Sequence, residues 1–94
     1  MALLLRLTQR PFRERRWGTE SVIFDNYSGE THYLNPLASA IFHRVAAGGP
    51  VDLDEICTEF VAAASTGAVE PEDIGSAAAR LCRTGLMQAE DTEG

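Results

Sequence analysis

The chain has 94 residues, of which 45% are hydrophobic and 23% charged, and these proportions are ordinary for a globular domain. Its length leaves room for one small domain with a modest core. The formal net charge of −6, from eight basic and fourteen acidic residues, argues against a partner that is a polyanion such as DNA.

The charge is divided unevenly between the two halves of the chain. Residues 1–50 carry six arginines and four acidic residues, a net charge of +2, whereas residues 51–94 carry two arginines and ten acidic residues, a net charge of −8. The only N-terminal apolar run, "ALLL", ends at Arg6 and is too short for a membrane span or a signal-peptide core. We therefore expect a cytoplasmic protein, in which Cys57 and Cys82 are unpaired thiols within apolar helical patterns.

The first third of the chain predicts β-structure. Residues 1–16 form an arginine-rich lead-in with one candidate strand, Leu3–Leu7. The segment Val22–Phe24 has high β-propensity. The turn residues Asn26–Gly29 and the return strand Glu30–Leu34 complete a hairpin.

The loop length of this hairpin sets its register. With a four-residue loop, Val22 and Ile23 face Tyr33 and His32, respectively. The return strand is short and alternates, so that Thr31 shares a face with Tyr33. An exposed strand edge accepts another strand through main-chain hydrogen bonds. The sequence therefore offers this strand as a docking edge for an extended peptide.

Two helices with clear boundary signals follow. The first begins at Asn35-Pro36, where Asn caps the helix and Pro suits its first position, and ends at Gly48-Gly49-Pro50. The second begins at Asp52, which has Glu55 at capping-box spacing, and ends at Thr66-Gly67. Their expected core residues, at helical spacing, are Leu37, Ala38, Ile41, Phe42 and Val45, and then Leu53, Ile56, Cys57, Phe60, Val61 and Ala64.

The third helix begins at Pro71, with acidic residues at its positive end, and closes at Gly85. The segment "LMQA" adds a short strand, and residues 88–94 are expected to form a frayed acidic tail. The second and third helices form a helix-turn-helix pair beside the hairpin. We predict one α+β domain spanning residues 1–94, with a winged helix-turn-helix-like fold in which an N-terminal β-hairpin wing precedes three helices.

Catalysis and metal binding fit this pattern poorly. Asp25, Ser28 and His32 lie around the hairpin turn, but a catalytic triad also needs oxyanion donors and a pocket that excludes water. Asp25 and Ser28 are better explained as turn formers. The two histidines and two cysteines lack the spacing of metal ligands. We expect no catalytic residue, no metal and no cofactor.

A helix-turn-helix with a wing also has the shape of a DNA reader. In that mode the first turn of the third helix approaches the bases, and here this turn carries Glu70, Glu72 and Asp73, which repel phosphates. Arg80 and Arg83 come later in the helix. The shape permits DNA binding and the charge argues against it.

Three segments of the chain together resemble a known family. They are "SVIFDNYSGETHYLNPLASAIFHRV", "VDLDEICTEF" and "VEPEDIGSAAARLCRTGLM", with the junction Leu34-Asn35-Pro36 and the closing Leu81 and Gly85-Leu86 as signals. From about Trp17 to Met87 the chain resembles the PqqD-like family of small peptide chaperones, also called RiPP recognition elements. The segment "SGETHYLNP" is most similar to the branch associated with HPr-kinase-related proteins.

The resemblance implies a winged-helix protein without catalytic activity of its own. A precursor or leader peptide would add as a strand along the wing, lie against the third helix and be presented to a modifying enzyme, in some systems a radical-SAM protein. With Ile74 at the core centre and ~100° per residue, the helix has one flank with Arg80 and another with Cys82. We favour the Arg80 flank, because its guanidinium can bind an acidic peptide residue. The expected peptide-binding residues are Glu30, Thr31, His32, Tyr33, Leu34, Asp73, Ala77, Arg80 and Thr84.

Two alternatives stand beside this peptide-binding adaptor. One is a small winged-helix DNA-binding regulator. The other is a structural subunit of an enzyme complex, which would need a large apolar patch. The expected partners are the peptide and its modifying enzyme, with no nucleic acid and no membrane, and the Leu3–Leu7 segment leaves open a homodimer formed by strand exchange.

Overall fold

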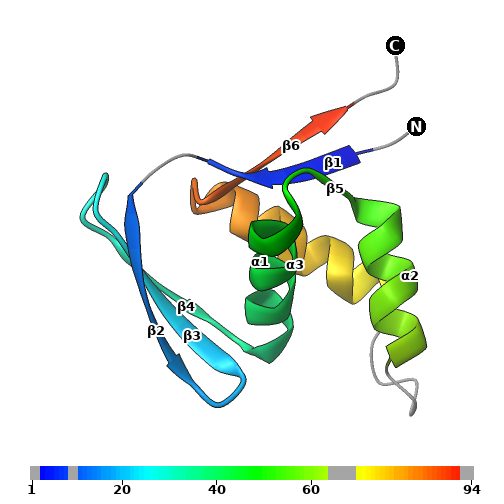
Figure 1. Ribbon diagram of the computed structural model, residues 1–94, viewed down its shortest axis with the longest axis horizontal. Coiled ribbons are helices and arrows are strands. Elements are labelled where there is room, and N and C mark those ends of the chain that lie inside the picture. Colours follow the sequence, from blue (N-terminus) through cyan, green and yellow to red (C-terminus); the bar gives the residue numbers. More distant parts are fainter. Residues whose placement is uncertain (1–2, 9–10, 64–69, 92–94) are drawn as a thin grey trace.

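The structure, a computed structural model, describes residues 3–8, 11–63 and 70–91. It is an α+β fold in which two small three-stranded antiparallel sheets, ordered β5-β1-β6 and β2-β3-β4, pack around three helices (Figure 1). The elements in chain order are β1 (Leu3–Leu7), β2 (Phe12–Trp17), β3 (Glu20–Asp25), β4 (Thr31–Leu34), α1 (Pro36–Gly48), β5 (Val51–Asp52), α2 (Leu53–Ala63), α3 (Pro71–Arg83) and β6 (Met87–Asp91). No helix in these ranges is long and apolar enough to cross a membrane.

Helix α1 lies at the centre of the fold and contacts both sheets and α3. Asn35 caps it, as predicted, by accepting a hydrogen bond of 2.8 Å from the Ala38 N–H to its Oδ1. Pro36 occupies the first helical position, and Gly49, with φ of 70°, stops the helix. The predicted apolar stripe is confirmed: Ala38, Ile41, Phe42 and Val45 are buried, and Leu37 packs against the core at its edge.

The predicted hairpin and its register are confirmed. Strands β3 and β4 are antiparallel, with Val22 opposite Tyr33 and Ile23 opposite His32. Gly29, with φ of 80°, supplies the left-handed backbone that the turn requires. Ile23 is fully buried, so this register places one face of the hairpin in the core.

The N-terminal lead-in was expected to contain one strand, Leu3–Leu7, which is confirmed as β1. The expectation missed a second strand: β2 pairs along the whole of β3, so that the predicted hairpin is part of a three-stranded sheet, β2-β3-β4, which we call the wing as a label only. Its sequence, "FRERRW", has no run of apolar residues, and all six residues are exposed. This segment is therefore a strand because it pairs with β3, and the local sequence does not reveal that pairing.

The short strand predicted at residues 86–89 is confirmed as β6, whereas the acidic tail expected over residues 88–94 is wrong for residues 88–91. These residues belong to β6, which pairs with β1, so that Leu5 lies opposite Ala89 and Leu7 opposite Met87. Burial of Leu5 and Met87 anchors β1 and β6 in the core. Residues 92–94 lie outside the described residues.

Helices α2 and α3 begin where predicted. The Asp52 carboxylate accepts a 2.8 Å hydrogen bond from the Asp54 N–H at the start of α2, and the Asp73 carboxylate accepts one of 3.2 Å from the Glu70 N–H at the start of α3. Val61 is 37% exposed, which corrects its place in the expected core. The core residues of these helices are Ile56, Ile74, Ala78 and Leu81, with Leu53, Cys57, Phe60, Ala77 and Cys82 partly buried. Ala64 and the predicted end of α2 at Thr66-Gly67 lie outside the described residues.

A pair of substitutions in β1 tests whether the lead-in is part of the core. Leu5 is 1% exposed and Leu3 is 37% exposed. We expect Leu5→Ala to lower the free energy of unfolding by about 2–5 kcal/mol, because it leaves a cavity, and Leu3→Ala by no more than about 1 kcal/mol. Urea denaturation of the two variants measures both values. Equal effects of the two substitutions would contradict the packing of β1.

Candidate functional site

Strand β4 forms one edge of the β2-β3-β4 sheet, and no described strand pairs with its outer side. Its side chains alternate in exposure, since Leu34 is 3% and Tyr33 61% exposed. The Tyr33 hydroxyl donates a hydrogen bond of 2.5 Å to the Glu20 carboxylate. This bond, with some desolvation and the nearby negative charge, raises the pKa of Tyr33. The edge therefore carries a buried anchor, Leu34, and an outward aromatic side chain.

The main chain of β4 presents unpaired groups at two positions. The Asp25 N–H donates to the Glu30 carbonyl at 2.8 Å, which makes these two residues a hydrogen-bonded pair. Bonded and non-bonded pairs alternate along an antiparallel ladder, so the main chain of His32 is bonded to β3. The N–H and C=O groups of Thr31 and Tyr33 consequently point toward the open edge. An added strand would bond to these two residues.

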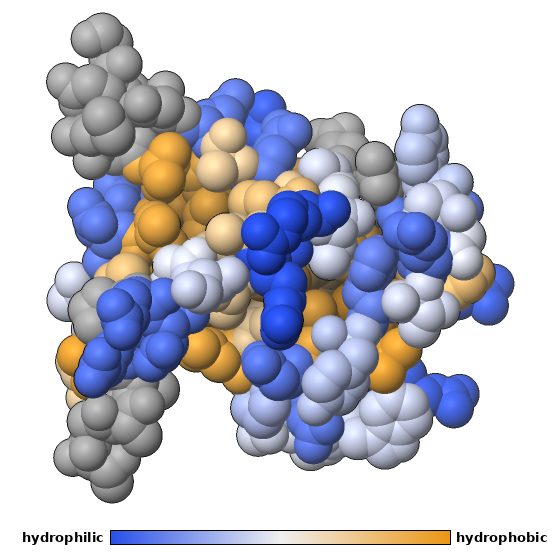
Figure 2. Space-filling view, turned by 180° about the vertical axis from the view of Figure 1, so that it is seen from behind, coloured by the Kyte–Doolittle hydropathy of each residue, from blue (hydrophilic) through white to orange (hydrophobic). Residues whose placement is uncertain are grey.

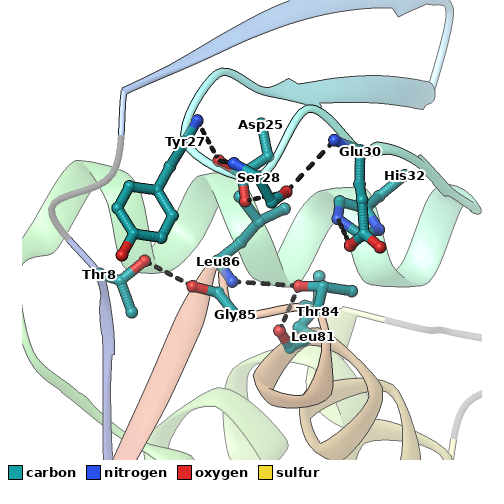
Figure 3. A network of polar contacts seen from close by, with 10 residues as sticks. All are labelled: Thr8, Asp25, Tyr27, Ser28, Glu30, His32, Leu81, Thr84, Gly85 and Leu86. Atoms are coloured by element: carbon teal, nitrogen blue, oxygen red, sulfur yellow. Dashed lines mark hydrogen bonds and ion pairs between the residues drawn. The ribbon is translucent and has the colours of Figure 1, made fainter.

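Asp25 and Ser28, two of the three residues considered above as a catalytic triad, hold the turn before β4 (Figure 3). The buried Asp25 carboxylate accepts hydrogen bonds from the Tyr27 N–H at 2.9 Å and from the Ser28 hydroxyl at 3.0 Å. The Ser28 oxygen accepts one from the Glu30 N–H at 3.2 Å. Asp25 and Ser28 thus act as turn formers, as predicted, and fix the point at which β4 begins.

His32 lies on the inner side of the edge strand. Its Nε2 atom is buried and has no hydrogen-bond partner in the described part of the chain, and a Glu30 carboxylate oxygen lies 3.8 Å from it. Figure 3 shows the two side chains next to each other above the junction between α3 and β6. The imidazole is a packing group of the wing in this arrangement.

A groove separates α3 from the start of α1. It begins where β4 ends, because Asn35 directly follows the strand. Its lining comprises Asn35, Pro36, Leu37, Asp73, Ser76, Ala77, Arg80 and Arg83. The flank of α3 that carries Asp73, Ala77 and Arg80 therefore faces the end of the edge strand, and the flank with Cys82 does not line the groove.

The groove differs from the expected wall at several positions. Thr84 is not part of its lining: the Thr84 hydroxyl donates to the Leu81 carbonyl at 2.6 Å and accepts from the Leu86 N–H at 3.1 Å, and so shapes the turn into β6 (Figure 3). Sequence reasoning missed Ser76 and Arg83 on α3 and the role of Asn35-Pro36-Leu37 as the opposite wall. The spacing of Arg83, three residues after Arg80, was a usable signal.

The charges of the groove favour an acidic ligand. Arg80 and Arg83 are exposed, and neither makes an ion pair with a described residue. The Asp73 carboxylate is engaged with the Glu70 N–H. Two free guanidinium groups can each form charge-assisted hydrogen bonds with a carboxylate.

A second polar cluster, unforeseen from the sequence, fastens the wing to α1. The Glu14 carboxylate contacts His43 Nε2 and accepts a hydrogen bond of 3.0 Å from the Ser21 hydroxyl. The Ser21 and Ser39 hydroxyls are 2.7 Å apart, and Ser39 Oγ lies 3.4 Å from His43 Nδ1. Ser21 and Ser39 are buried, so each hydroxyl needs these partners. The cluster joins β2, β3 and α1 and thereby holds β4 in place.

The two cysteines are free, as predicted, and lie half-buried on α2 and α3. Burial raises the pKa of both thiols, and the Asp54 charge raises that of Cys57 further. Little thiolate therefore forms at neutral pH, which suits a packing role. Across residues 3–8, 11–63 and 70–91, no three His, Cys, Asp or Glu side chains gather as metal ligands would.

Comparison of the chain with protein-family models, with curated proteins and with solved structures finds no match. The resemblance to the PqqD-like family therefore depends on the three sequence segments that carry it.

The polar cluster under the wing makes a testable prediction about stability. Glu14→Ala should lower the free energy of unfolding by about 1–3 kcal/mol, because it removes an acceptor from buried Ser21 and the partner of His43. Arg16→Ala, on the same strand and exposed, is the control and should change it by at most about 0.5 kcal/mol. Urea denaturation measures both. The cluster has no fastening role if the two variants are equally stable.

Proposed function

We propose that the chain is a non-catalytic peptide-binding adaptor of winged-helix architecture. A precursor or leader peptide adds as a strand to β4, lies against α3 and is presented in this form to a modifying enzyme. The observation that carries the proposal is the open edge of β4, with the main-chain groups of Thr31 and Tyr33 directed outward. Strand addition uses such groups for affinity and adjacent side-chain pockets for specificity.

The groove supports the same proposal. A peptide strand that runs along β4 arrives at Asn35, where the groove lined by Arg80 and Arg83 begins. The two arginines then bind an acidic residue of the peptide. The small side chain of Ala77, between Asp73 and the arginines, leaves room for a side chain of the peptide. Helices α2 and α3 and the β2-β3-β4 sheet are compatible with the winged-helix arrangement that the resemblance implies.

Two further expectations belong to this proposal. The free cysteines Cys57 and Cys82 suit the reducing cytoplasm. The first turn of α3 carries Glu72 and Asp73, which disfavours the alternative of a DNA-binding regulator, because a phosphate backbone would meet negative charge there.

One observation favours the alternative of a structural subunit. Figure 2 shows apolar residues gathered on the half of that face that holds β1, β6 and α2, whereas the half with the β2-β3-β4 sheet is mainly polar. Leu3 and Val61 in this half are each 37% exposed. Permanent association with a large subunit would cover such a surface. A strong rise in thermal stability on mixing with one protein partner, and no peptide binding, would support this alternative.

Strand addition predicts a large effect of proline at one position of β4. The probes are peptides selected on the wild-type protein from a displayed library of short random sequences. Tyr33→Pro should weaken their binding roughly tenfold or more, because it removes an outward N–H without removing a β3 bond. Tyr33→Thr keeps that N–H and should keep most of the affinity.

Circular dichroism confirms that both variants are folded. Equal binding by Tyr33→Pro and wild type, or failure of the library to yield any binder, would contradict strand addition.

The groove makes a separate prediction. The selected peptides should be enriched in Asp or Glu, and Arg80→Glu with Arg83→Glu should weaken their binding, since repulsion replaces two charge-assisted contacts. Isothermal calorimetry gives the affinities. The control reverses one charge elsewhere, at Arg16, which is exposed on β2 and outside the groove, and should leave binding unchanged. Peptides without acidic residues that bind the double variant normally would exclude the groove.

A further inference from the structure

The β2-β3-β4 sheet has a second surface, on the face turned away from the helices (Figure 1). The opposite face, with Ser21, Ile23 and Leu34, is buried. Strand register places the outward side chains on one face, and they are Arg13, Arg15, Trp17, Glu20, Val22, Phe24, Thr31 and Tyr33. We call this set the aromatic–arginine face.

Three aromatic rings of this face are exposed to an unusual degree. Trp17 is 56%, Phe24 39% and Tyr33 61% exposed. Arg13 lies opposite Phe24 and Arg15 opposite Val22, and a shallow hollow is lined by Arg13, Glu14, Arg15, Trp17, Val22 and Phe24. In Figure 1, no helix ribbon of the described residues lies against this face of the sheet. These apolar side chains remain in contact with water, although their burial on the inner face would stabilise the fold.

The charge of the face is positive. The Arg15 guanidinium lies 6.0 Å from the centre of the Trp17 ring, and neither Arg13 nor Arg15 makes an ion pair with a described residue. The one carboxylate of the face, that of Glu20, is occupied by the Tyr33 hydroxyl. Two free guanidinium groups therefore flank exposed aromatic rings, in a chain whose net charge is −6.

We propose that the aromatic–arginine face docks an acidic segment of a protein partner. Exposed Trp, Tyr, Phe and Arg are the residues that protein interfaces concentrate. Carboxylates of the partner would bind Arg13 and Arg15, and its apolar side chains would cover Trp17 and Phe24. The surplus of negative charge on the rest of the chain disfavours a nucleic acid, which would otherwise stack on the same rings.

This face is separate from the docking edge. The edge uses the outward main chain of β4, whereas the face uses side chains, of which Arg13, Arg15 and Trp17 are on β2 at the far side of the sheet. Both surfaces can therefore be occupied at the same time. We assign the acidic segment to the enzyme that receives the peptide, and this assignment rests on the proposed function. The inference that the face docks an acidic segment does not rest on it.

Trp17 is the only tryptophan of the chain, so its fluorescence reports on this face alone. The probe is a synthetic peptide of glutamate and phenylalanine, and its controls are the same peptide with glutamine for glutamate, oligo-deoxythymidine and vesicles of anionic phospholipid. We expect the glutamate peptide to shift the Trp17 emission at low salt and high salt to weaken this effect. The three controls should have little effect.

Charge variants separate the two surfaces. Arg13→Glu with Arg15→Glu should weaken binding of the glutamate peptide roughly tenfold or more, and the Gln double variant should weaken it less. Arg80→Glu with Arg83→Glu carries the same change of charge in the groove and should leave the Trp17 response intact. Circular dichroism confirms folding of each variant.

Several results would overturn the proposal. These are equal binding of the glutamate and glutamine peptides, normal binding by both double variants at Arg13 and Arg15, or a stronger response to oligo-deoxythymidine or to vesicles. A Trp17 emission that changes with protein concentration alone would instead make a second copy of the chain the occupant. Loss of this surface would leave the docking edge unaffected, because the edge is tested with library-selected peptides that still bind the Arg13→Glu, Arg15→Glu variant.

Discussion

The burial of one face of α1 is the constraint on which the positions of both candidate surfaces depend. Ala38, Ile41, Phe42 and Val45 are each at most 2% exposed. The helix contacts the wing, α3 and β1. Because α1 starts directly after β4, its packing decides where the edge strand ends. Because α3 packs against α1, the same contacts decide where Arg80 stands relative to that edge.

The wing is attached to α1 by two kinds of contact. The apolar side chains Ile23 and Leu34 are buried, and the ring of Phe12 meets that of Phe42 edge-on at 5.5 Å between centroids. The polar cluster from Glu14 to His43 fixes the orientation of the sheet relative to α1, because hydrogen bonds are directional and apolar contacts are not. In the proposed function, a wing held in this way would present β4 to a peptide strand without first having to order it. Preorganisation of this kind lowers the entropic cost of binding.

The exposed edge also has features that limit unwanted pairing. Strand β4 has four residues, and two of its side chains, Thr31 and His32, are polar. Short and polar edges resist aggregation, because few main-chain groups are offered in a row. Under the proposed function, the same shortness would restrict a docked peptide to a few main-chain bonds. Affinity and selectivity would then come from side chains in the adjacent groove.

Local signals in the sequence were sufficient for the hairpin and for α1. The turn residues Asn26–Gly29 imply a loop length and hence the register, and Asn35-Pro36 implies where the helix begins. Strand β2 could not be predicted in this way, since its residues are mostly charged and only its pairing with β3 reveals it. The sequence indicated β6 at residues 86–89, but its extension to Asp91 depends on pairing with the distant β1. Helical spacing grouped Asp73, Ala77 and Arg80 on one flank, but the direction of that flank is set by packing of α3 on α1.

The most direct test of the account is the rate of amide hydrogen exchange along β4, measured by NMR in the free protein and with a library-selected peptide bound. The account predicts that the amides of Thr31 and Tyr33 exchange much faster than those of His32 and Leu34 in the free protein. Binding of the peptide should then slow Thr31 and Tyr33 to the level of their neighbours. Fast exchange of Thr31 and Tyr33 with the peptide bound would contradict docking by strand addition.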